Sequence, residues 1–320
     1  MARSQAVASG VGQPVSAQPA SVLVGTAAFG APLLVLALGH MLSNMLRTLP
    51  AIATDVMAVD IGVSAEALAS LTGAYHFAFA AGQIPVGVAL DRYGVRTVSL
   101  TLFAIVTVGA ALAAVVGGAA GFFLAQIVLG VGCCGMLLCP MTLAAKLLTP
   151  AKFGLWSGLI QGVGNSGMLL SASPLAWLIE MAGWRAGYGV AAVAGVVIAG
   201  LVFLLVPNTP PERGEGHATL RSEAREVVQI GLSVRMRGII ILALVSFAVM
   251  IGIRGLWGGP WLMDVKGLSR VEAGAVLMPL TIALVLGPIA FGMLDRRIGH
   301  RRALIIAGTR DATFDFNGTW

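Results

Sequence analysis

The stretch Gly87-Val-Ala-Leu-Asp91-Arg92-Tyr-Gly94-Val-Arg96 decides the fold of this chain. It is a short charged turn between two runs of about twenty apolar residues, each long enough to cross about 30 Å of hydrocarbon. A second version, Gly292-Met-Leu-Asp295-Arg296-Arg297-Ile-Gly299-His-Arg301, follows another apolar run later in the chain. Two apolar spans joined by a tight basic turn, occurring twice, predict a membrane protein built from two related halves.

The composition is that of a membrane protein rather than a water-soluble globule. Hydrophobic residues make up 58% of the chain and charged residues 11%, whereas soluble domains carry about 25% charged residues. Mean hydropathy is +0.91, which leaves too little polar surface to coat a soluble domain of this size. The net charge of +6 comes from Lys and Arg in short loops between apolar runs, a distribution that does not predict binding to nucleic acid. We therefore predict an all-α bundle of transmembrane helices surrounded by the lipid bilayer.

Eight apolar runs of spanning length follow a polar leader. Residues 1–26 are rich in Ala, Ser, Gln and Gly and are expected to form a disordered cytoplasmic leader. The predicted spans cover residues 29–52, 67–90, 97–117, 119–144, 155–180, 184–206, 238–262 and 272–294.

These spans divide the chain into two unequal parts. Residues 27–206 predict a six-helix N-terminal half, and residues 207–237 a polar cytoplasmic linker. Residues 238–308 predict a partial C-terminal half that holds helices 7 and 8 and a stub of helix 9. The apolar stretch after Arg302 covers only about 9 Å and is too short to cross a bilayer. An atypical polar tail, residues 309–320, follows it, and this change favours a truncation or a frameshift near residue 308.

Lys and Arg are distributed unevenly on the two sides of the predicted bundle. Fifteen of the twenty fall on the side that carries the leader, the linker and the charged turns, and three fall on the other side. The remaining two, Arg47 and Arg254, lie within spans, and the loop 53–66 carries three acidic residues and no Lys or Arg. Because basic loops stay in the cytoplasm, we expect a cytoplasmic N-terminus in a bacterial-type inner membrane.

The first charged turn resembles the signature loop of the major facilitator superfamily. That pattern is Gly, three residues, Asp-Arg, one residue, Gly, and then Arg or Lys. The turn matches it at five positions: Gly87, Asp91, Arg92, Gly94 and Arg96. The resemblance implies a secondary transporter that works by alternating access, with its substrate at mid-bilayer between two halves of six helices each.

The second charged turn matches the same pattern less closely. Asp295 stands one place early and Arg296 occupies the usual Asp position, whereas the spacing from Gly292 to Gly299 holds and Arg301 follows it. In the superfamily the loop Asp acts on the end of a helix in the opposite half and governs switching. Helix 11, on which Asp91 would act, is missing here, which leaves a topological anchor as the simpler interpretation of the first turn.

Arg47 is the first candidate binding residue. His40, Asn44 and Arg47 lie at i, i+4 and i+7 and therefore share one face of the first helix. A charge at bilayer depth costs at least about 2.5 kcal/mol, so it normally faces a wet cavity or a partner. The alternatives are an arginine that reaches the outer interface near Pro50, or one that pairs with Asp55.

Arg254 is the second candidate and lies well inside the seventh predicted span. The alternative is a structural ion pair with a carboxylate elsewhere. The placement of one arginine in helix 1 and one in helix 7 resembles the organophosphate–phosphate antiporters of the superfamily, in which two such arginines grip the substrate's phosphate. A guanidinium suits that role because its planar fork bonds two anionic oxygens at once. From this resemblance we take only a preference for an anion.

Polar residues in three other helices complete the candidate set. Proton coupling would need His40 or His76, because no Asp or Glu lies deep within a span; packing is the simpler role for either histidine. Gln161 and Asn165 share a face of the fifth span and could line the path, as could Tyr75 of the second span. The glycines around them predict close helix packing, and they resemble the glycine-rich fifth helix of some superfamily transporters. These glycines are Gly158, Gly162, Gly164 and Gly167.

The predicted function is transport of a small organic solute across the membrane, with an organic anion as the preferred class. The open alternatives are an efflux carrier for apolar compounds and a truncated, non-transporting membrane protein. An enzyme is not expected, because no nucleophile–base set or phosphate loop is visible. We expect no cofactor and no metal, since the three cysteines fall in one apolar run without ligand-spaced partners. The oligomeric state is left open.

Overall fold

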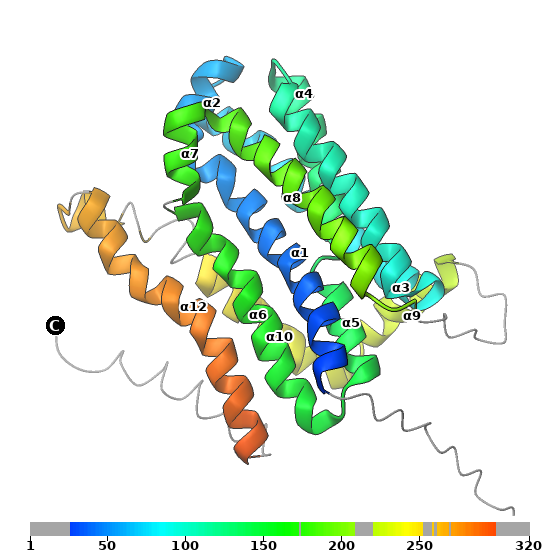
Figure 1. Cartoon of the computed structure of the whole chain (residues 1–320). Coiled ribbons are helices and arrows are strands. Elements are labelled where there is room, and N and C mark those ends of the chain that lie inside the picture. Colours follow the sequence, from blue (N-terminus) through cyan, green and yellow to red (C-terminus); the bar gives the residue numbers. More distant parts are fainter. Residues whose placement is uncertain are drawn as a thin grey trace, which may run out of the picture.

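The computed structural model describes residues 26–172, 174–208, 220–251, 258, 261–268 and 270–298. Over these residues the elements are helical and there is no β-strand, which confirms the predicted all-α class (Figure 1). In chain order they are α1 (Thr26–Ile52), α2 (Thr54–Ile61), α3 (Ala65–Val115), α4 (Ala119–Cys133), α5 (Leu138–Leu147), α6 (Pro150–Ala172), α7 (Pro174–Ala182), α8 (Trp184–Leu205), α9 (Leu220–Gly231), α10 (Val234–Ile251), the π-helical turn η2 (Trp261–Val265) and α12 (Arg270–Ile298).

Five stretches of the described chain are long and apolar enough to cross a membrane. They are Phe29–Ile52, Ala65–Val115, Ala119–Leu147, Trp184–Leu205 and Val276–Arg297. This judgement rests on helix length and composition, and it supports a multi-pass membrane protein. α6 is not among them because Gln161, Asn165 and several serines lower its hydropathy.

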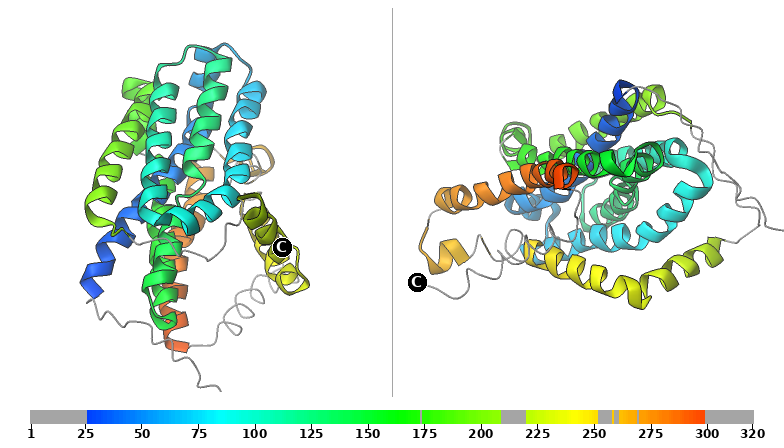
Figure 2. Two further views of the ribbon diagram at one scale, coloured as in Figure 1. Left: turned by 90° about the vertical axis from the view of Figure 1, so that its right-hand side faces the viewer. Right: turned by 90° about the horizontal axis from the view of Figure 1, so that it is seen from below.

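α3 contains two of the predicted spans, 67–90 and 97–117, within one element. Its 51 residues would extend about 76 Å at 1.5 Å per residue, more than twice the thickness of the hydrocarbon layer. Within α3 only Gly94 leaves helical dihedrals, with φ 77° and ψ 162°, and the helix turns back on itself (Figure 2). Residues with a side chain rarely adopt this conformation, so the backbone itself requires the last glycine of the charged turn.

Two predicted spans each cover two helices. The span expected at 119–144 lies within one apolar stretch, Ala119–Leu147, in which a turn at residues 134–137 separates α4 from α5. The span expected at 155–180 covers most of α6 and α7, and residue 173 between them lies outside the described residues.

The predicted linker and the seventh span also differ from expectation. Residues 220–231 of the expected linker 207–237 form the helix α9. α10 begins at Val234, four residues before the expected span, and its described part ends at Ile251. The rest of that span is described only in part, and Arg254 lies outside the described residues.

An aromatic cluster fills the core where α4 meets α8. The rings of Phe122, Trp184 and Tyr188 contact one another edge to face, with centroids 6.0 to 6.4 Å apart. Gln126 donates a 3.1 Å hydrogen bond to the Tyr188 hydroxyl. Satisfying both buried polar groups within the cluster stabilises this packing.

Glycines let α6 approach α12 and α1 closely. A Cβ atom at Gly158 would collide with the Pro288 carbonyl oxygen of α12, and a Cβ at Gly162 would lie 2.6 Å from the Ile289 side chain. On the α1 side, a Cβ at Gly164 would collide with the His40 ring, and one at Gly167 with the Met41 carbonyl oxygen. The packing role predicted for these glycines therefore agrees with the contacts, since glycine removes the side chain that would separate two backbones.

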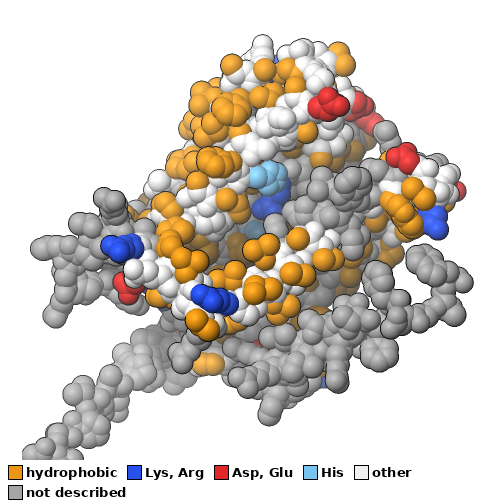
Figure 3. Space-filling model, turned by 180° about the vertical axis from the view of Figure 1, so that it is seen from behind, with side chains coloured by type: hydrophobic (Ala, Val, Ile, Leu, Met, Phe, Trp, Pro, Cys, Tyr) orange, Lys and Arg blue, Asp and Glu red, His pale blue; other side chains and the backbone are white. Residues whose placement is uncertain are grey.

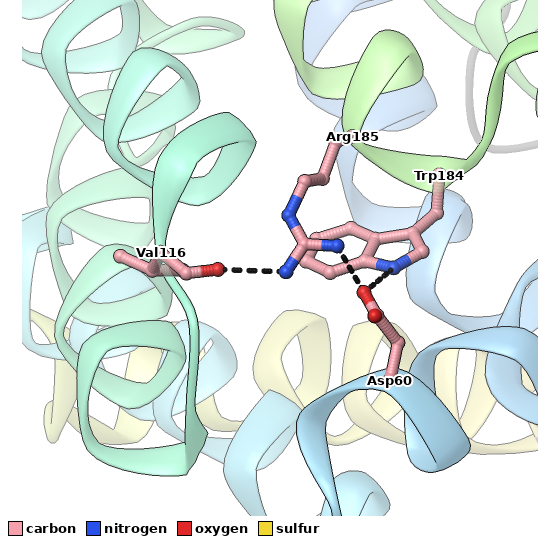
Figure 4. Close-up of polar contacts among 4 residues, drawn as sticks. All are labelled: Asp60, Val116, Trp184 and Arg185. Atoms are coloured by element: carbon pink, nitrogen blue, oxygen red, sulfur yellow. Dashed lines mark hydrogen bonds and ion pairs between the residues drawn. The ribbon is translucent and has the colours of Figure 1, made fainter.

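At the end of the bundle that carries α2, the side chains of Asp60 and Arg185 together join three segments of the chain (Figure 4). Asp60 of α2 accepts hydrogen bonds from the Arg185 guanidinium and, at 2.9 Å, from the Trp184 indole, both at the start of α8. Arg185 also donates a 3.0 Å bond to the Val116 carbonyl oxygen after α3. The hydrogen bonds from Arg185 and then Trp184 lower the pKa of Asp60 below its usual value of 3.8.

Candidate functional site

A cavity of about 560 Å³ lies between α1, α3, α6 and α12 and the break between α4 and α5. Its wall is largely apolar, with polar side chains from α1, α3 and α6. α12 belongs to the predicted C-terminal part, so the cavity lies between the two parts of the chain. The residues that line it are His40, Ser43, Asn44, Arg47, Phe79, Gln83, Cys133, Leu137, Leu138, Gln161, Asn165, Met168, Ala283, Leu284, Gly287, Pro288 and Phe291.

α1 supplies the polar face of the cavity, as its spacing predicts. His40, Asn44 and Arg47 all line the wall, and Ser43 joins them. The Asn44 amide donates a 2.9 Å hydrogen bond to the Gly164 carbonyl oxygen and lies 3.5 Å from Nε2 of His40. This bond ties α1 to α6 inside the cavity wall.

Arg47 points into the cavity rather than out to the membrane interface. Its guanidinium carbon lies 5.2 Å from the centre of the Phe79 ring, which is a cation–π distance. Its Nε atom is buried and has no hydrogen-bond partner within the described part of the chain. Every other described residue of the wall lacks a formal charge except for the titratable His40. The wall therefore presents a cation without a carboxylate.

α6 contributes two amides with different surroundings. Asn165 donates a 2.7 Å hydrogen bond to the Leu284 carbonyl oxygen, which connects α6 to α12 across the cavity edge. The Gln161 carbonyl oxygen Oε1 is buried and has no hydrogen-bond partner among the described residues. The Gln161 side chain lies close enough to the His40 ring to interact with it.

Three predicted residues are not part of the described wall. Tyr75 is buried behind it, with its hydroxyl 3.4 Å from the Ser43 hydroxyl. His76 is exposed, and its Nδ1 lies 3.4 Å from the Thr72 carbonyl oxygen of its own helix. Neither residue therefore lines the cavity, although both lie on α3. The structure does not describe Arg254.

Sequence reasoning did not predict most of the apolar wall, although one polar residue of α3 carried a signal. Gln83 is an uncharged polar residue in an apolar run, one helical turn after Phe79, so both share a face. The α12 residues of the wall have no comparable signal, because only the tertiary packing of α6 against α12 brings them there. The residues missed are Ser43, Phe79, Gln83, Cys133, Leu137, Leu138, Met168, Ala283, Leu284, Gly287, Pro288 and Phe291.

The space-filling view from behind shows a hollow on this face of the bundle (Figure 3). Pale-blue histidine and blue Lys or Arg atoms lie together inside it, and hydrophobic and uncharged side chains lie beside them on the described part of this face. Acidic side chains gather near the rim of the molecule on this face and not in the hollow. The charge distribution of this face thus agrees with that of the cavity wall.

The first charged turn lies at the reversal of α3. Asp91 and Arg92 are exposed, and Gly94 is buried. The Arg96 guanidinium donates to the Phe203 carbonyl oxygen near the end of α8 and lies 4.7 Å from the Phe203 ring centre. The described contacts of Arg96 therefore fix the turn to α8. Gly87 lies in α3, and a Cβ atom at this position would meet no other atom within 4 Å.

The second charged turn ends α12 beside the start of α6. The Asp295 carboxylate lies against Gly154 in the first turn of α6, close enough that a Cβ at Gly154 would collide with it. Arg296 is exposed. Gly299 and Arg301 lie outside the described residues. A carboxylate at a helix N-terminus is in a favourable position relative to the helix dipole.

The sequence of this chain also matches a known protein family. A sequence profile of the Major Facilitator Superfamily matches residues 33–309. The chain belongs to the Major Facilitator Superfamily. It is a multi-pass helical membrane protein of that superfamily, and this family points to a transporter rather than to an enzyme.

Two curated relatives of this superfamily chain are bacterial. The tetracenomycin C resistance and export protein of Streptomyces glaucescens is 26% identical over 331 residues, which cover 86% of this chain and 60% of the relative. The uncharacterized MFS-type transporter YbcL of Bacillus subtilis is 25% identical over 242 residues, which cover 73% of this chain and 58% of the relative. The chain therefore spans about three-fifths of the length of these relatives.

Solved structures of the superfamily share the fold. The human organic anion transporter MFSD10 superposes with a TM-score of 0.61 at 17% identity, over 84% of this chain and 73% of that one. The proton:xylose symporter XylE superposes with a TM-score of 0.55 at 18% identity, over 87% of this chain and 70% of that one. At these identities the likeness concerns the fold alone.

Proposed function

We propose that this superfamily chain acts in secondary transport of a small organic anion by alternating access, with the anion bound in the cavity beside Arg47. The single observation that carries the proposal is the charge of the wall. Among the described lining residues Arg47 is the one permanent charge, and no carboxylate neutralises it. A substrate that brings the missing negative charge would complete the site.

The energetics of burial favour an anionic substrate. A cation in an apolar, water-poor environment lacks the solvation that it has in water. The Nε atom of Arg47 is buried without a hydrogen-bond partner in the described part of the chain. A carboxylate or phosphate would supply both the charge and a hydrogen-bond acceptor, and such charge-assisted bonds are roughly twice as strong as neutral ones. Phe79 holds the guanidinium by its ring face and leaves the guanidinium edge for the ligand.

The position of the cavity suits alternating access. It lies between α1 and α6 on one side and α12 on the other, and the glycines of α6 let its backbone lie close to α12. Alternating access places the substrate between the two halves of a transporter. We include Arg254 in this proposal as a second anion-binding residue, and a cytoplasmic N-terminus in a bacterial-type inner membrane.

A second candidate is efflux of apolar compounds. Most of the wall is apolar, with Phe79, Met168 and Phe291 among its larger side chains. The Streptomyces glaucescens relative is named a resistance and export protein. An apolar substrate would use these side chains and would gain nothing from Arg47.

The test is counterflow in proteoliposomes with labelled organic carboxylates, organophosphates and phosphate. We expect exchange by the chain, a loss of at least about tenfold in Arg47→Gln and partial retention in Arg47→Lys. Lys152→Gln is the matched control, because it removes an exposed cation at the start of α6, away from the cavity wall.

Each alternative has a distinct result in that assay. Arg47-independent exchange of neutral apolar compounds, without exchange of anions, would replace the anion proposal by efflux. Retention of labelled anion by the purified chain without exchange would identify a binding protein that does not transport.

A further inference from the structure

Two buried polar atoms of residues in the cavity wall have no hydrogen-bond partner among the described residues, and one is a donor whereas the other is an acceptor. Nε of Arg47 on α1 is a donor, and Oε1 of Gln161 on α6 is an acceptor. Both atoms are buried, and the described part of the chain satisfies neither of them. Because leaving a buried polar group unpaired is unfavourable, such atoms in a cavity mark where a ligand makes its own hydrogen bonds.

The packing of α1 on α6 sets the distance between these two groups. The helices lie side by side and run in the same direction (Figure 1), and they are joined by two hydrogen bonds, Asn44 to Gly164 at 2.9 Å and Thr48 to Ser171 at 2.7 Å. Arg47 follows Asn44 by three residues, whereas Gln161 precedes Gly164 by three. At 1.5 Å per residue their Cα atoms are therefore separated by about 9 Å along the helix axes.

The cavity that these two groups line is wide and mostly apolar. Its volume is about 560 Å³, and its larger apolar side chains include Phe79, Met168 and Phe291. Pockets of about 300 to 1,000 Å³ normally hold drug-sized organic molecules. Inorganic phosphate or a two-carbon acid would leave most of this space unfilled and could not reach both polar groups.

We propose that the substrate is an elongated organic monoanion: a carboxylate at one end beside Arg47, a hydroxyl or amide N–H donor at the other end beside Gln161, and a largely apolar body that fills the rest of the cavity. This inference rests on the proposed anion transport and adds the substrate class to it. One cation in the described wall matches one negative charge. The Gln161 carbonyl oxygen selects a neutral donor, because an anionic group there would face an acceptor.

Positional isomers of hydroxynaphthoate test this geometry directly. We would measure equilibrium binding of 6-hydroxy-2-naphthoate, 3-hydroxy-2-naphthoate and 2-naphthoate to the purified chain in nanodiscs. We expect the 6-hydroxy isomer to bind about threefold to tenfold more tightly than 2-naphthoate, because its distant hydroxyl reaches Gln161. The 3-hydroxy isomer, whose hydroxyl lies beside the carboxylate, should gain no such advantage.

Two variants test which residue binds each end of the ligand. Gln161→Leu should abolish the advantage of the 6-hydroxy isomer over 2-naphthoate. Arg47→Gln should abolish the preference for 6-hydroxy-2-naphthoate over its carboxamide, a preference that we expect to be at least about tenfold. Gln229→Leu is the matched control, because Gln229 is exposed on α9 and is not part of the wall. The isomer comparison uses the unaltered chain, so it stands even if a variant fails to fold.

The outcomes separate this inference from the proposed function. Equal binding of all three naphthoates, or an equal loss for all three in Gln161→Leu, would overturn the substrate class. If Arg47-dependent exchange of other anions persisted in proteoliposomes, anion transport would still stand. Equal binding of the acid and its carboxamide, with no anion exchange in the counterflow assay, would overturn both.

Discussion

Asn44 shows how a single polar residue in an apolar helix serves both the packing and the cavity. Its amide donates across to the Gly164 carbonyl oxygen of α6, and its side chain is also part of the cavity wall. Asn44 is buried, so its polar atoms depend on these contacts rather than on water. The residue therefore sets the register of α1 on α6, from which the position of Arg47 relative to Gln161 follows.

Replacing Asn44 should loosen this register. For Asn44→Leu we expect a lower midpoint of thermal unfolding in detergent, corresponding to a loss of about 1 kcal/mol, because an interhelical hydrogen bond inside a membrane protein contributes about that amount. The control is Thr101→Val, whose hydroxyl bonds only to the Thr97 carbonyl oxygen of its own helix. An unchanged midpoint for Asn44→Leu would contradict the role of this bond.

Sequence reasoning at the scale of residues succeeded where periodicity was sufficient. The spacing of His40, Asn44 and Arg47 predicts a shared face, and the structure brings all three to one cavity. Periodicity could not decide which face of α3 turns inward, because α3 is apolar on all sides. Periodicity therefore could not indicate that Tyr75 is buried behind the wall and that His76 is exposed.

At the scale of elements, the contact between α6 and α12 is the part of the fold on which the cavity most depends. Three glycines of α6 face this contact, and α12 contributes five residues to the wall. The sequence predicted that α6 would pack closely through its glycines. It could not identify α12 as the partner, because nothing in the glycine pattern of one helix specifies which neighbour it meets.

A methyl group at Gly158 should separate these helices. For Gly158→Ala we expect a loss of anion binding and a destabilisation of about 1 to 3 kcal/mol, because the new Cβ would overlap the Pro288 carbonyl oxygen. Gly189→Ala in α8 is the matched control, since a Cβ there meets no atom within 4 Å. Ligand binding and thermal unfolding of the two variants would be compared, and equal behaviour would refute the close contact.

The junction of α2 with α8 gives a pH-dependent prediction. Because Arg185 and Trp184 lower the pKa of Asp60, the ionised carboxylate stabilises the fold above the usual pKa of 3.8, and this contribution is lost as the pH falls further. Asp60→Asn should therefore unfold at a lower temperature than the unaltered chain at pH 7, and the difference should shrink below pH 3.8. The measurement is the difference in unfolding midpoint between the two proteins from pH 7 to pH 3. A difference that grows on acidification would show the opposite linkage.

At the scale of the whole molecule, the sequence was sufficient for the class of protein and insufficient for the course of the helices. Composition and the charged turn predicted a helical membrane protein of this superfamily, and the comparisons confirm it. The turn at residues 134–137, which separates α4 from α5 within one apolar stretch, was not predicted. The helix α9 within the expected linker was not predicted either.

The orientation of the molecule remains a prediction that chemical labelling can check. In a chain with its three cysteines replaced by alanine, Val59→Cys should react with a membrane-impermeant maleimide added outside intact cells, and Leu232→Cys should not. Both positions are well exposed, at 84% and 70%, so a difference in labelling would report sidedness rather than burial. The positive-inside distribution requires this result, and the reverse pattern would overturn the proposed orientation.

Because the chain reverses at the single residue Gly94, no flexible loop separates the two membrane-spanning segments of α3. If one crossing slid along the membrane normal, the exposed Asp91 and Arg92 would be drawn toward hydrocarbon, at a cost of about 2.5 kcal/mol or more for each charge. The two crossings are therefore expected to move together, along with α8, to which Arg96 fixes the turn. If the proposed alternating access is correct, the movement that exposes the cavity to each side is therefore expected to involve α6 and α12, which lie close together at the glycines of α6.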